Sequence, residues 1–347
     1  MLYSYTIIGP LVIFILSFIF ALLIITPFIR FLIRYRLGKS IRAEGDTPVF
    51  TSLHKKKEGI PTMGGLFIWV IVALLAIILS LLAKYFPHSF FERLDFLDRS
   101  ETWLPLGALV IAGAVGALDD LLNIKKIGPN GGGMKLKTRL FLYSLIAIGG
   151  AWWFYFKLGW NAINIPGFGE VFLGLWYIPL FILVVVATSF SLNETDGLDG
   201  LAGGVALTAF SAYGLIAFTQ GKIELTMLIA AIVGALVAFI WFNIYPAAFF
   251  MGDTGSMALG TTLGVIAMLT NTVFILPIIG FILVIESLSV IIQTASKKLR
   301  GKKIFLSTPI HHHFEALGWP ETKVTMRFWI ISGMAAVFGL IIALTVK

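Results

Sequence analysis

The sequence predicts an all-α integral membrane protein with about ten transmembrane helices. Of its 347 residues, 58% are apolar and only 13% are charged, and the mean hydropathy is +0.95. Soluble domains are nearer half apolar and a quarter charged. The apolar residues also gather in runs of bilayer-spanning length, roughly 17–25 residues each. We therefore expect one polytopic membrane domain over residues 1–347.

Ten apolar stretches are candidates for spanning helices. The first is too long for the core of a signal peptide and ends among arginines, so we expect a retained helix rather than a cleaved leader. Only short separators divide the fifth stretch from the sixth and the eighth from the ninth, which leaves nine or eleven as alternative counts. In chain order, the stretches are 7–33, 64–85, 103–122, 139–158, 172–190, 200–219, 223–244, 255–271, 273–297 and 325–346.

The basic residues predict how these helices are oriented. Of the 26 lysines and arginines, 20 lie around the loops that follow the first, third and ninth stretches. By the positive-inside rule these loops are cytoplasmic, and both termini then lie outside. The net charge of +8 is accounted for by this topology and by anionic lipid headgroups. Nucleic acid is not an expected partner, because the basic residues are divided among separate loops.

Five polar motifs follow the odd-numbered stretches, so we expect all of them at the cytoplasmic face. Polar groups are costly in a bilayer and usually serve chemistry there. A shared face therefore predicts an active site. The motifs are Lys57 with Pro61-Thr62-Met63-Gly64-Gly65, the pair Asp119-Asp120, the segment 193–200, Asn243 with Met251-Gly252-Asp253, and His311-His312-His313.

The aspartates are the candidate metal ligands. Asp119 and Asp120 end an apolar stretch, and neighbours on a helix diverge by about 100°, so one is expected to bind a metal and the other to contact substrate or act as a base. Solvated acids at a helix end are the alternative. Asp253, between two glycines, has the alternative of a helix N-cap. Carboxylate oxygens suit Mg²⁺, and the chain has no cysteine, which excludes thiolate chemistry.

The segment 193–200 carries three regularly spaced polar residues. Asn193, Asp196 and Asp199 are three residues apart, so on a helix they would form one polar ridge. A tight loop with capping acids is the alternative. Together with cations for phosphate oxygens, the aspartates favour phosphoryl transfer, in which positioning and charge neutralisation dominate catalysis. The candidate cations are Lys57, Lys125, Lys137 and Arg139.

The three histidines do not match a zinc site. Consecutive side chains cannot easily converge on one ion, and structural zinc ligands are spaced differently. Contact with a phosphate, or support of a metal by one of the three, is the favoured interpretation. The chain also lacks a phosphate-binding P-loop, because the glycine-rich segment 128–137 has no Gly-Lys-Ser/Thr ending.

As a set, the motifs resemble those of the phospho-N-acetylmuramoyl-pentapeptide transferase family, within the polyprenyl-phosphate N-acetylhexosamine-1-phosphate transferase superfamily. The resemblance runs nearly from end to end. Its residues, in order, are His54-x-x-Lys57 with the Pro61 motif, Asp119-Asp120, Asn193-x-Thr-Asp-Gly-Leu-Asp-Gly200, Trp241-Phe-Asn243, Phe250-Met-Gly-Asp253 and Pro309-Ile-His-His-His-Phe-Glu315.

This resemblance implies an enzyme of the bacterial cytoplasmic membrane that makes a lipid-linked sugar. It would move phospho-MurNAc-pentapeptide from UDP-MurNAc-pentapeptide to undecaprenyl phosphate, giving lipid I and UMP in peptidoglycan synthesis. Mg²⁺ would be required, and a homodimer is implied. Direct attack by the lipid phosphate is favoured over a phospho-enzyme, because the chain has no cysteine and its aspartates already have roles.

The resemblance also implies a role for each site residue. Asp253 would be the main Mg²⁺ ligand, with Asp119 and Asp120 beside it. Asp119 would also deprotonate or orient the lipid phosphate, and His312 would join these aspartates as a catalytic residue. Phe250 would stack on uracil, with Leu198, Asn243 and Gln293 near the nucleoside. The remaining substrate contacts would be Lys57, Thr62, Asn193, Asp196, Asp199, His311, His313, Lys137 and Arg139.

Four features depart from the family pattern. Asn123 and Phe190 replace a lysine and an asparagine that the family usually has, Arg139 replaces a lysine, and 128–133 resembles an insertion. These departures leave open which cation contacts the phosphates.

Two other functions stay open at this point. A relative in the same superfamily would use UDP-N-acetylglucosamine instead. A transporter for a polyprenyl-linked or anionic solute would place acids near the bilayer midplane, whereas the acids of this chain are expected at helix ends only.

Overall fold

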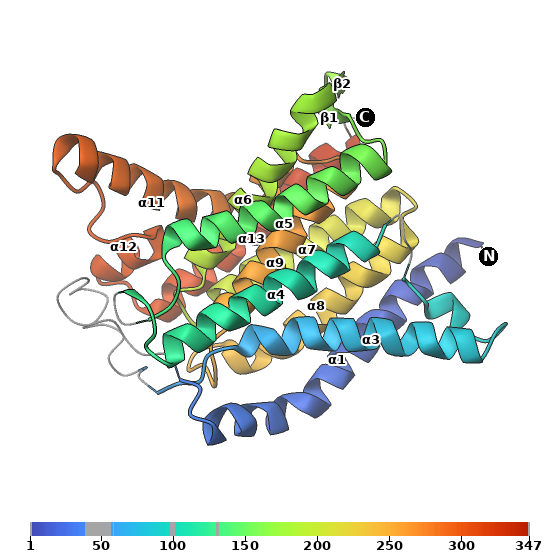
Figure 1. Cartoon of the computed structure of the whole chain (residues 1–347), viewed down its shortest axis with the longest axis horizontal. Coiled ribbons are helices and arrows are strands. Elements are labelled where there is room, and N and C mark those ends of the chain that lie inside the picture. The colour runs from blue at the N-terminus through green and yellow to red at the C-terminus, as the bar shows by residue number, and fades with distance from the viewer. Residues whose placement is uncertain (1, 39–56, 58, 98–100, 130–131, 346–347) are drawn as a thin grey trace.

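The chain is almost entirely helical. The computed structural model describes residues 2–38, 57, 59–97, 101–129 and 132–345 (Figure 1). Each of the ten predicted apolar stretches forms a helix, which confirms the all-α membrane fold. These helices are α1 (Leu2–Arg34), α3 (Gly64–Tyr85), α4 (Trp103–Ile124), α5 (Leu136–Trp152), α6 (Tyr177–Thr195), α7 (Leu201–Thr219), α8 (Ile223–Asn243), α9 (Gly252–Leu269), α11 (Phe281–Arg300) and α13 (Glu321–Thr345).

Shorter elements join the long helices. A π-helical turn (Trp153–Lys157) extends α5, and 3₁₀ turns occur at Glu92–Leu94 and Gly174–Trp176. The short helices are α10 (Leu276–Ile279) and α12 (Ile310–Ala316). The hairpin of β1 (Ala162–Ile165) and β2 (Gly169–Phe172) was not predicted. Its antiparallel register pairs Ala162 with Phe172, so the fifth helix begins at Tyr177 rather than near residue 172.

The number of membrane spans is not confirmed as ten. Within the described residues, eight helices are long and apolar enough to cross a bilayer, and α9 and α11 are not among them. Every residue of α9 is buried, so it faces neighbouring helices instead of lipid and tolerates Asp, Thr and Ser. The helix α11 carries Glu286 and ends in three cations, Lys297, Lys298 and Arg300.

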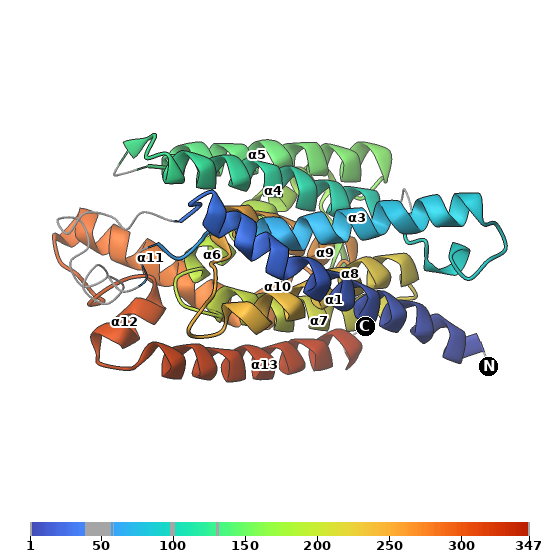
Figure 2. The same cartoon turned by 90° about the horizontal axis from the view of Figure 1, so that it is seen from below.

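The long helices form a bundle around α9. Figure 2 shows α4 and α5 on one side, α13 on the other and α9 between them. The helix α9 makes its most extensive contacts with α4 and α6. Both termini lie on the side of the bundle away from α12 (Figure 1), as an even number of antiparallel helices requires. Which side of the membrane this is stays a prediction.

Glycines allow the closest helix contacts, as is common where helices pack in membranes. A Cβ at Gly65 of α3 would lie 2.0 Å from the Cα of Gly255 in α9. A Cβ at Gly116 of α4 would lie 2.3 Å from the carbonyl oxygen of Asp253. The backbones of α3 and α4 are therefore pressed against the first turn of α9.

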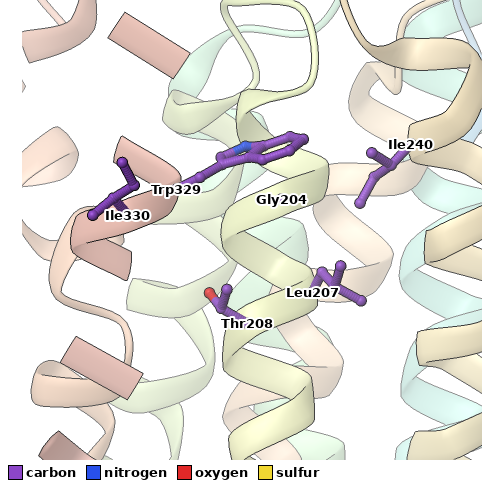
Figure 3. Close-up of a pocket in the computed structure, with 6 residues that line it drawn as sticks. All are labelled: Gly204, Leu207, Thr208, Ile240, Trp329 and Ile330. Atoms are coloured by element: carbon purple, nitrogen blue, oxygen red, sulfur yellow. The ribbon is translucent and has the colours of Figure 1, made fainter. Parts of the chain in front are cut away.

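An apolar cavity of about 330 Å³ lies elsewhere, between α7, α8 and α13 (Figure 3). Trp329 reaches across α7 at Gly204, and its Nε1 donates a hydrogen bond to the carbonyl oxygen of Gly200 at 3.1 Å. The cavity is lined by Gly204, Leu207, Thr208, Ile240, Trp329 and Ile330. None of these belongs to the polar motifs, so the cavity is not the predicted site.

The glycine contact at α9 can be tested by adding one methyl group. We expect Gly65→Ala to lower the apparent melting temperature in detergent by several degrees, because overpacking costs about 1–3 kcal/mol. Gly107→Ala in α4 is the matched control, since a Cβ there meets nothing within 4 Å. Tryptophan fluorescence during heating measures both variants. Equal melting temperatures would contradict the close contact between α3 and α9.

Candidate active site

One arginine joins two buried aspartates at the end of the bundle. Arg139 in the first turn of α5 places Nε 2.5 Å from Oδ2 of Asp119 on α4. Its Nη2 lies 3.1 Å from Oδ2 of Asp253 in the first turn of α9. The side chain of Asp119 is fully buried and that of Asp253 is 9% exposed. The guanidinium thus offsets two carboxylates that burial would otherwise make unfavourable.

Asn193, in the last turn of α6, completes this group. Its Nδ2 donates hydrogen bonds to Oδ1 of Asp253 at 2.6 Å and to Oγ of Ser256 at 2.9 Å. Its Oδ1 accepts a hydrogen bond from Nη1 of Arg139 at 3.2 Å. Four helices therefore converge on one polar network, which we call the carboxylate centre: Asp119, Arg139, Asn193 and Asp253.

Asp120 faces a different group from Asp119, as the divergence of neighbouring helical residues predicts. Its two carboxylate oxygens accept hydrogen bonds from the backbone N–H groups of Asp253 and Thr254, at 3.1 and 3.0 Å. These N–H groups belong to the first turn of α9, where an anionic acceptor is favourable. Asp120 therefore anchors the helix that carries Asp253.

The predicted polar ridge over 193–200 is wrong. The helix α6 ends at Thr195, and Gly200 adopts a left-handed conformation with φ +75°. The three polar side chains consequently diverge. Asn193 joins the carboxylate centre, Asp196 Oδ2 accepts the backbone N–H of Gly252 at 3.0 Å, and Asp199 Oδ2 accepts that of Ala247 at 3.0 Å.

Lys57 lies in a second ionic group. Its Nζ is 2.5 Å from Asp199 Oδ1 and 2.5 Å from Glu321 Oε1, and it lies 5.7 Å from the centre of the Phe250 ring. Glu321 Oε1 also accepts the backbone N–H of Asp199 at 2.7 Å. Glu321 was not predicted as a site residue, although an acid at the start of an apolar stretch was a visible signal.

The Pro61–Gly65 motif pairs through its backbone with the loop before α9. Phe250 donates its N–H to the carbonyl oxygen of Pro61, and Gly64 donates to that of Phe250, both at 2.8 Å. Thr62 is fully buried, and its Oγ1 has no hydrogen-bond partner among the described residues. The motif therefore holds Phe250 and Asp253 in place. His54, which precedes the motif, lies outside the described residues.

Two side-chain amides that were expected near the nucleoside, those of Asn243 and Gln293, form hydrogen bonds with backbone groups. Asn243 Oδ1 accepts the N–H of Gly200 at 3.1 Å, and Nδ2 donates to the carbonyl oxygen of Phe249 at 2.8 Å. Gln293 Oε1 accepts the N–H of Ile304 at 2.9 Å. Leu198 is buried, with 4% of its surface exposed.

Each histidine of α12 has a different partner. Nδ1 of His311 lies 2.9 Å from Glu286 Oε2, and Nδ1 of His312 lies 2.6 Å from Glu315 Oε2. Nδ1 of His313 accepts the N–H of Leu306 at 3.2 Å. Glu286 lies inside α11, so the expectation of acids at helix ends only is wrong.

Two of the predicted cations belong to neither the carboxylate centre nor the group around Lys57. Lys125 caps the end of α4 and Lys137 lies in the first turn of α5, and both are exposed. Arg139, two residues after Lys137, is the cation that the fold turns inward. Helix periodicity separates the two, because residues two apart do not face the same way.

The carboxylate centre fits a magnesium ion that also binds substrate phosphates. Across the described residues, no group of three or more His, Cys, Asp or Glu is arranged to hold a metal. Mg²⁺ usually takes one or two carboxylates plus phosphate oxygens, and Asp119 and Asp253 supply two. Oδ2 of Asp119 is paired with Nε of Arg139 at 2.5 Å. Among the described residues, Thr62, Asn123 and Tyr143 each have a buried polar atom without a hydrogen-bond partner.

Comparisons with known proteins match the regions of the chain that carry these residues. Residues 102–271 match the family model described as glycosyl transferase family 4, and residues 57–68 match phospho-N-acetylmuramoyl-pentapeptide-transferase signature 1. These regions contain all four residues of the carboxylate centre and the Pro61–Gly65 motif.

Curated relatives match nearly the whole chain. A phospho-N-acetylmuramoyl-pentapeptide-transferase of Chloroflexus aurantiacus is 38% identical over 94% of this chain and 88% of its own length. Those of Anoxybacillus flavithermus and Levilactobacillus brevis are each 39% identical, over 94% and 91% of this chain and 95% and 94% of their own lengths. The chain therefore belongs to the phospho-N-acetylmuramoyl-pentapeptide-transferase family.

Proposed function

We propose that this membrane enzyme transfers phospho-MurNAc-pentapeptide from UDP-MurNAc-pentapeptide to undecaprenyl phosphate, with lipid I and UMP as products. Family membership supports the reaction, since the curated relatives carry the name of this transferase. The observation that carries the proposal is the carboxylate centre, in which Arg139 joins Asp119 and Asp253. Buried carboxylates beside a guanidinium suit phosphoryl transfer, where charge must be held and neutralised.

Within this proposal, Asp253 and Asp119 would hold Mg²⁺. The ion would neutralise charge on the diphosphate and orient it. Asn193 fixes Asp253 through Oδ1, and Asp120 fixes the first turn of α9, so the metal ligand has little freedom to rotate. Arg139 presents further N–H donors, and its planar fork suits phosphate oxygens. Asp119 orients the attacking lipid phosphate or accepts its proton.

The second ionic group suits the nucleotide. Phe250 provides an aromatic surface for uracil and is held by backbone hydrogen bonds to the Pro61–Gly65 motif. Lys57 lies beside this ring and is paired with Asp199 and Glu321. An incoming diphosphate would compete with Asp199 and Glu321 for Lys57. The lysine would then contact the phosphates next to the uracil bound at Phe250. We include a homodimer in the proposal, supported by the family resemblance alone.

Purified protein can distinguish the two candidate sugar donors. We expect UMP release and a labelled lipid product from UDP-MurNAc-pentapeptide with undecaprenyl phosphate, and neither from UDP-N-acetylglucosamine. The reaction of UDP-MurNAc-pentapeptide should stop when EDTA removes Mg²⁺ and resume when Mg²⁺ is restored. Lipid product from UDP-N-acetylglucosamine alone would overturn the MurNAc assignment. Solute uptake into vesicles without UMP release would instead favour a transporter.

Asp253→Asn tests the metal-ligand role. The amide keeps the size of the side chain and one oxygen for Asn193, but it loses the negative charge that a magnesium ion requires. We expect kcat to fall roughly 100- to 1,000-fold, the range for removing one group that stabilises charge in a transition state. The elution profile in detergent should match wild type. Near-normal turnover would refute the role of Asp253.

Arg139→Lys tests whether the planar fork matters. Lysine keeps the charge but cannot contact Asp119, Asn193 and Asp253 together, so we expect kcat/KM to fall about 10- to 100-fold. Lys135→Ala is the matched control, because this exposed residue precedes α5 and makes no side-chain cap hydrogen bond. Its kcat/KM should stay within about twofold of wild type. A kcat/KM of Arg139→Lys that matches wild type would show that the positive charge alone, and not the planar fork, is needed at this position.

A further inference from the structure

A carboxylate inside α11 pairs with the first histidine of α12, at the end of the bundle that carries the polar motifs (Figure 1). The side chains of Glu286 and His311 have no exposed surface, and Oε2 lies 2.9 Å from Nδ1. A buried carboxylate is unfavourable without a partner. Within the described residues, Glu286 forms its ion pair with the imidazole of His311.

The opposite edge of the same ring faces the turn after α6. A Cβ at Gly197 would lie 2.2 Å from Nε2 of His311, so the missing side chain lets the imidazole approach the backbone. The neighbouring Asp196 accepts the N–H of Gly252, one residue before Asp253. The ring of His311 is therefore held between Glu286 and the turn that contacts the start of α9.

The position of Glu286 has a chemical consequence for the imidazole. A carboxylate oxygen accepts a hydrogen bond from Nδ1–H, so it selects the tautomer in which Nε2 carries the lone pair. Carboxylates that hold a metal-ligating histidine in this way fix both its tautomer and its orientation, and their loss typically costs 10- to 100-fold in metal affinity or activity. His313 is different, because its Nδ1 is an acceptor.

We propose that Glu286 is a positioning residue that fixes the tautomer and orientation of His311, so that Nε2 stays at the 196–197 turn beside the phosphate-binding region. This inference rests on the proposed function for the identity of the phosphates. Glu286 acts through His311. It was not among the predicted site residues.

A double-mutant cycle tests the coupling. In the assay with UDP-MurNAc-pentapeptide, we expect Glu286→Leu to lower kcat roughly 10- to 100-fold, while Glu286→Gln retains most of it because the amide oxygen still accepts the Nδ1 proton. The variant with both Glu286→Leu and His311→Ala should be no slower than His311→Ala alone. Ser287→Ala is the matched control, since this buried neighbour bonds Ser191 at 2.6 Å instead of a histidine.

Nitrogen NMR of histidine-labelled protein gives a second readout that does not depend on turnover. The chain has only five histidines, so single His→Gln variants can assign each ring. We expect His311 in wild type and in Glu286→Gln to carry its proton on Nδ1. In Glu286→Leu, the signal should change to a mixture of tautomers.

Two results would overturn the positioning role. The first is a double variant in which the loss of kcat equals the combined losses of Glu286→Leu and His311→Ala. The other is a wild-type His311 protonated on Nε2, an observation that needs no folded Glu286 variant. If wild-type protein releases no UMP from any sugar donor, the proposed function fails, while the NMR spectrum still decides whether Glu286 sets the tautomer.

Discussion

The ion pairs of Arg139 with Asp119 and Asp253 are the constraint on which the rest of the site depends. Two carboxylates that lie close together and away from water repel each other, and removing the partner of a buried charge costs about 3–5 kcal/mol. The fold therefore has to bring α4, α5 and α9 together at one point. Asn193 adds α6 by bonding to both Asp253 and Arg139.

The central helix α9 makes this convergence possible. Gly65 and Gly116 let α3 and α4 approach its backbone, and Asp120 accepts two N–H groups of its first turn. A helix enclosed by other helices meets no lipid, so its sequence can be polar at the end that carries Asp253. The same enclosure explains why α9 is not apolar enough to be recognised as a membrane span.

Hydropathy predicted most of the fold, and motif spacing predicted part of the site. Apolar runs located all ten long helices, whereas the β1–β2 hairpin carried no such signal. The ridge over 193–200 failed because α6 ends at Thr195, and regular spacing cannot indicate where a helix stops. Glu286 and Glu321 were missed for another reason: each is a single acid, and its importance appears only when its partner, His311 or Lys57, is known.

The sequence by itself determined the class of protein, the helices and the resemblance to the transferase family, because apolar run length and motif order are local properties of the chain. The tertiary structure decided which polar groups meet. Asp119 and Asp253 are separated by more than a hundred residues, yet they share one guanidinium. Nothing local selects Arg139 over Lys137 for that position. The selection follows from helix packing, because only the side chain that faces inward between α4 and α9 can reach both carboxylates.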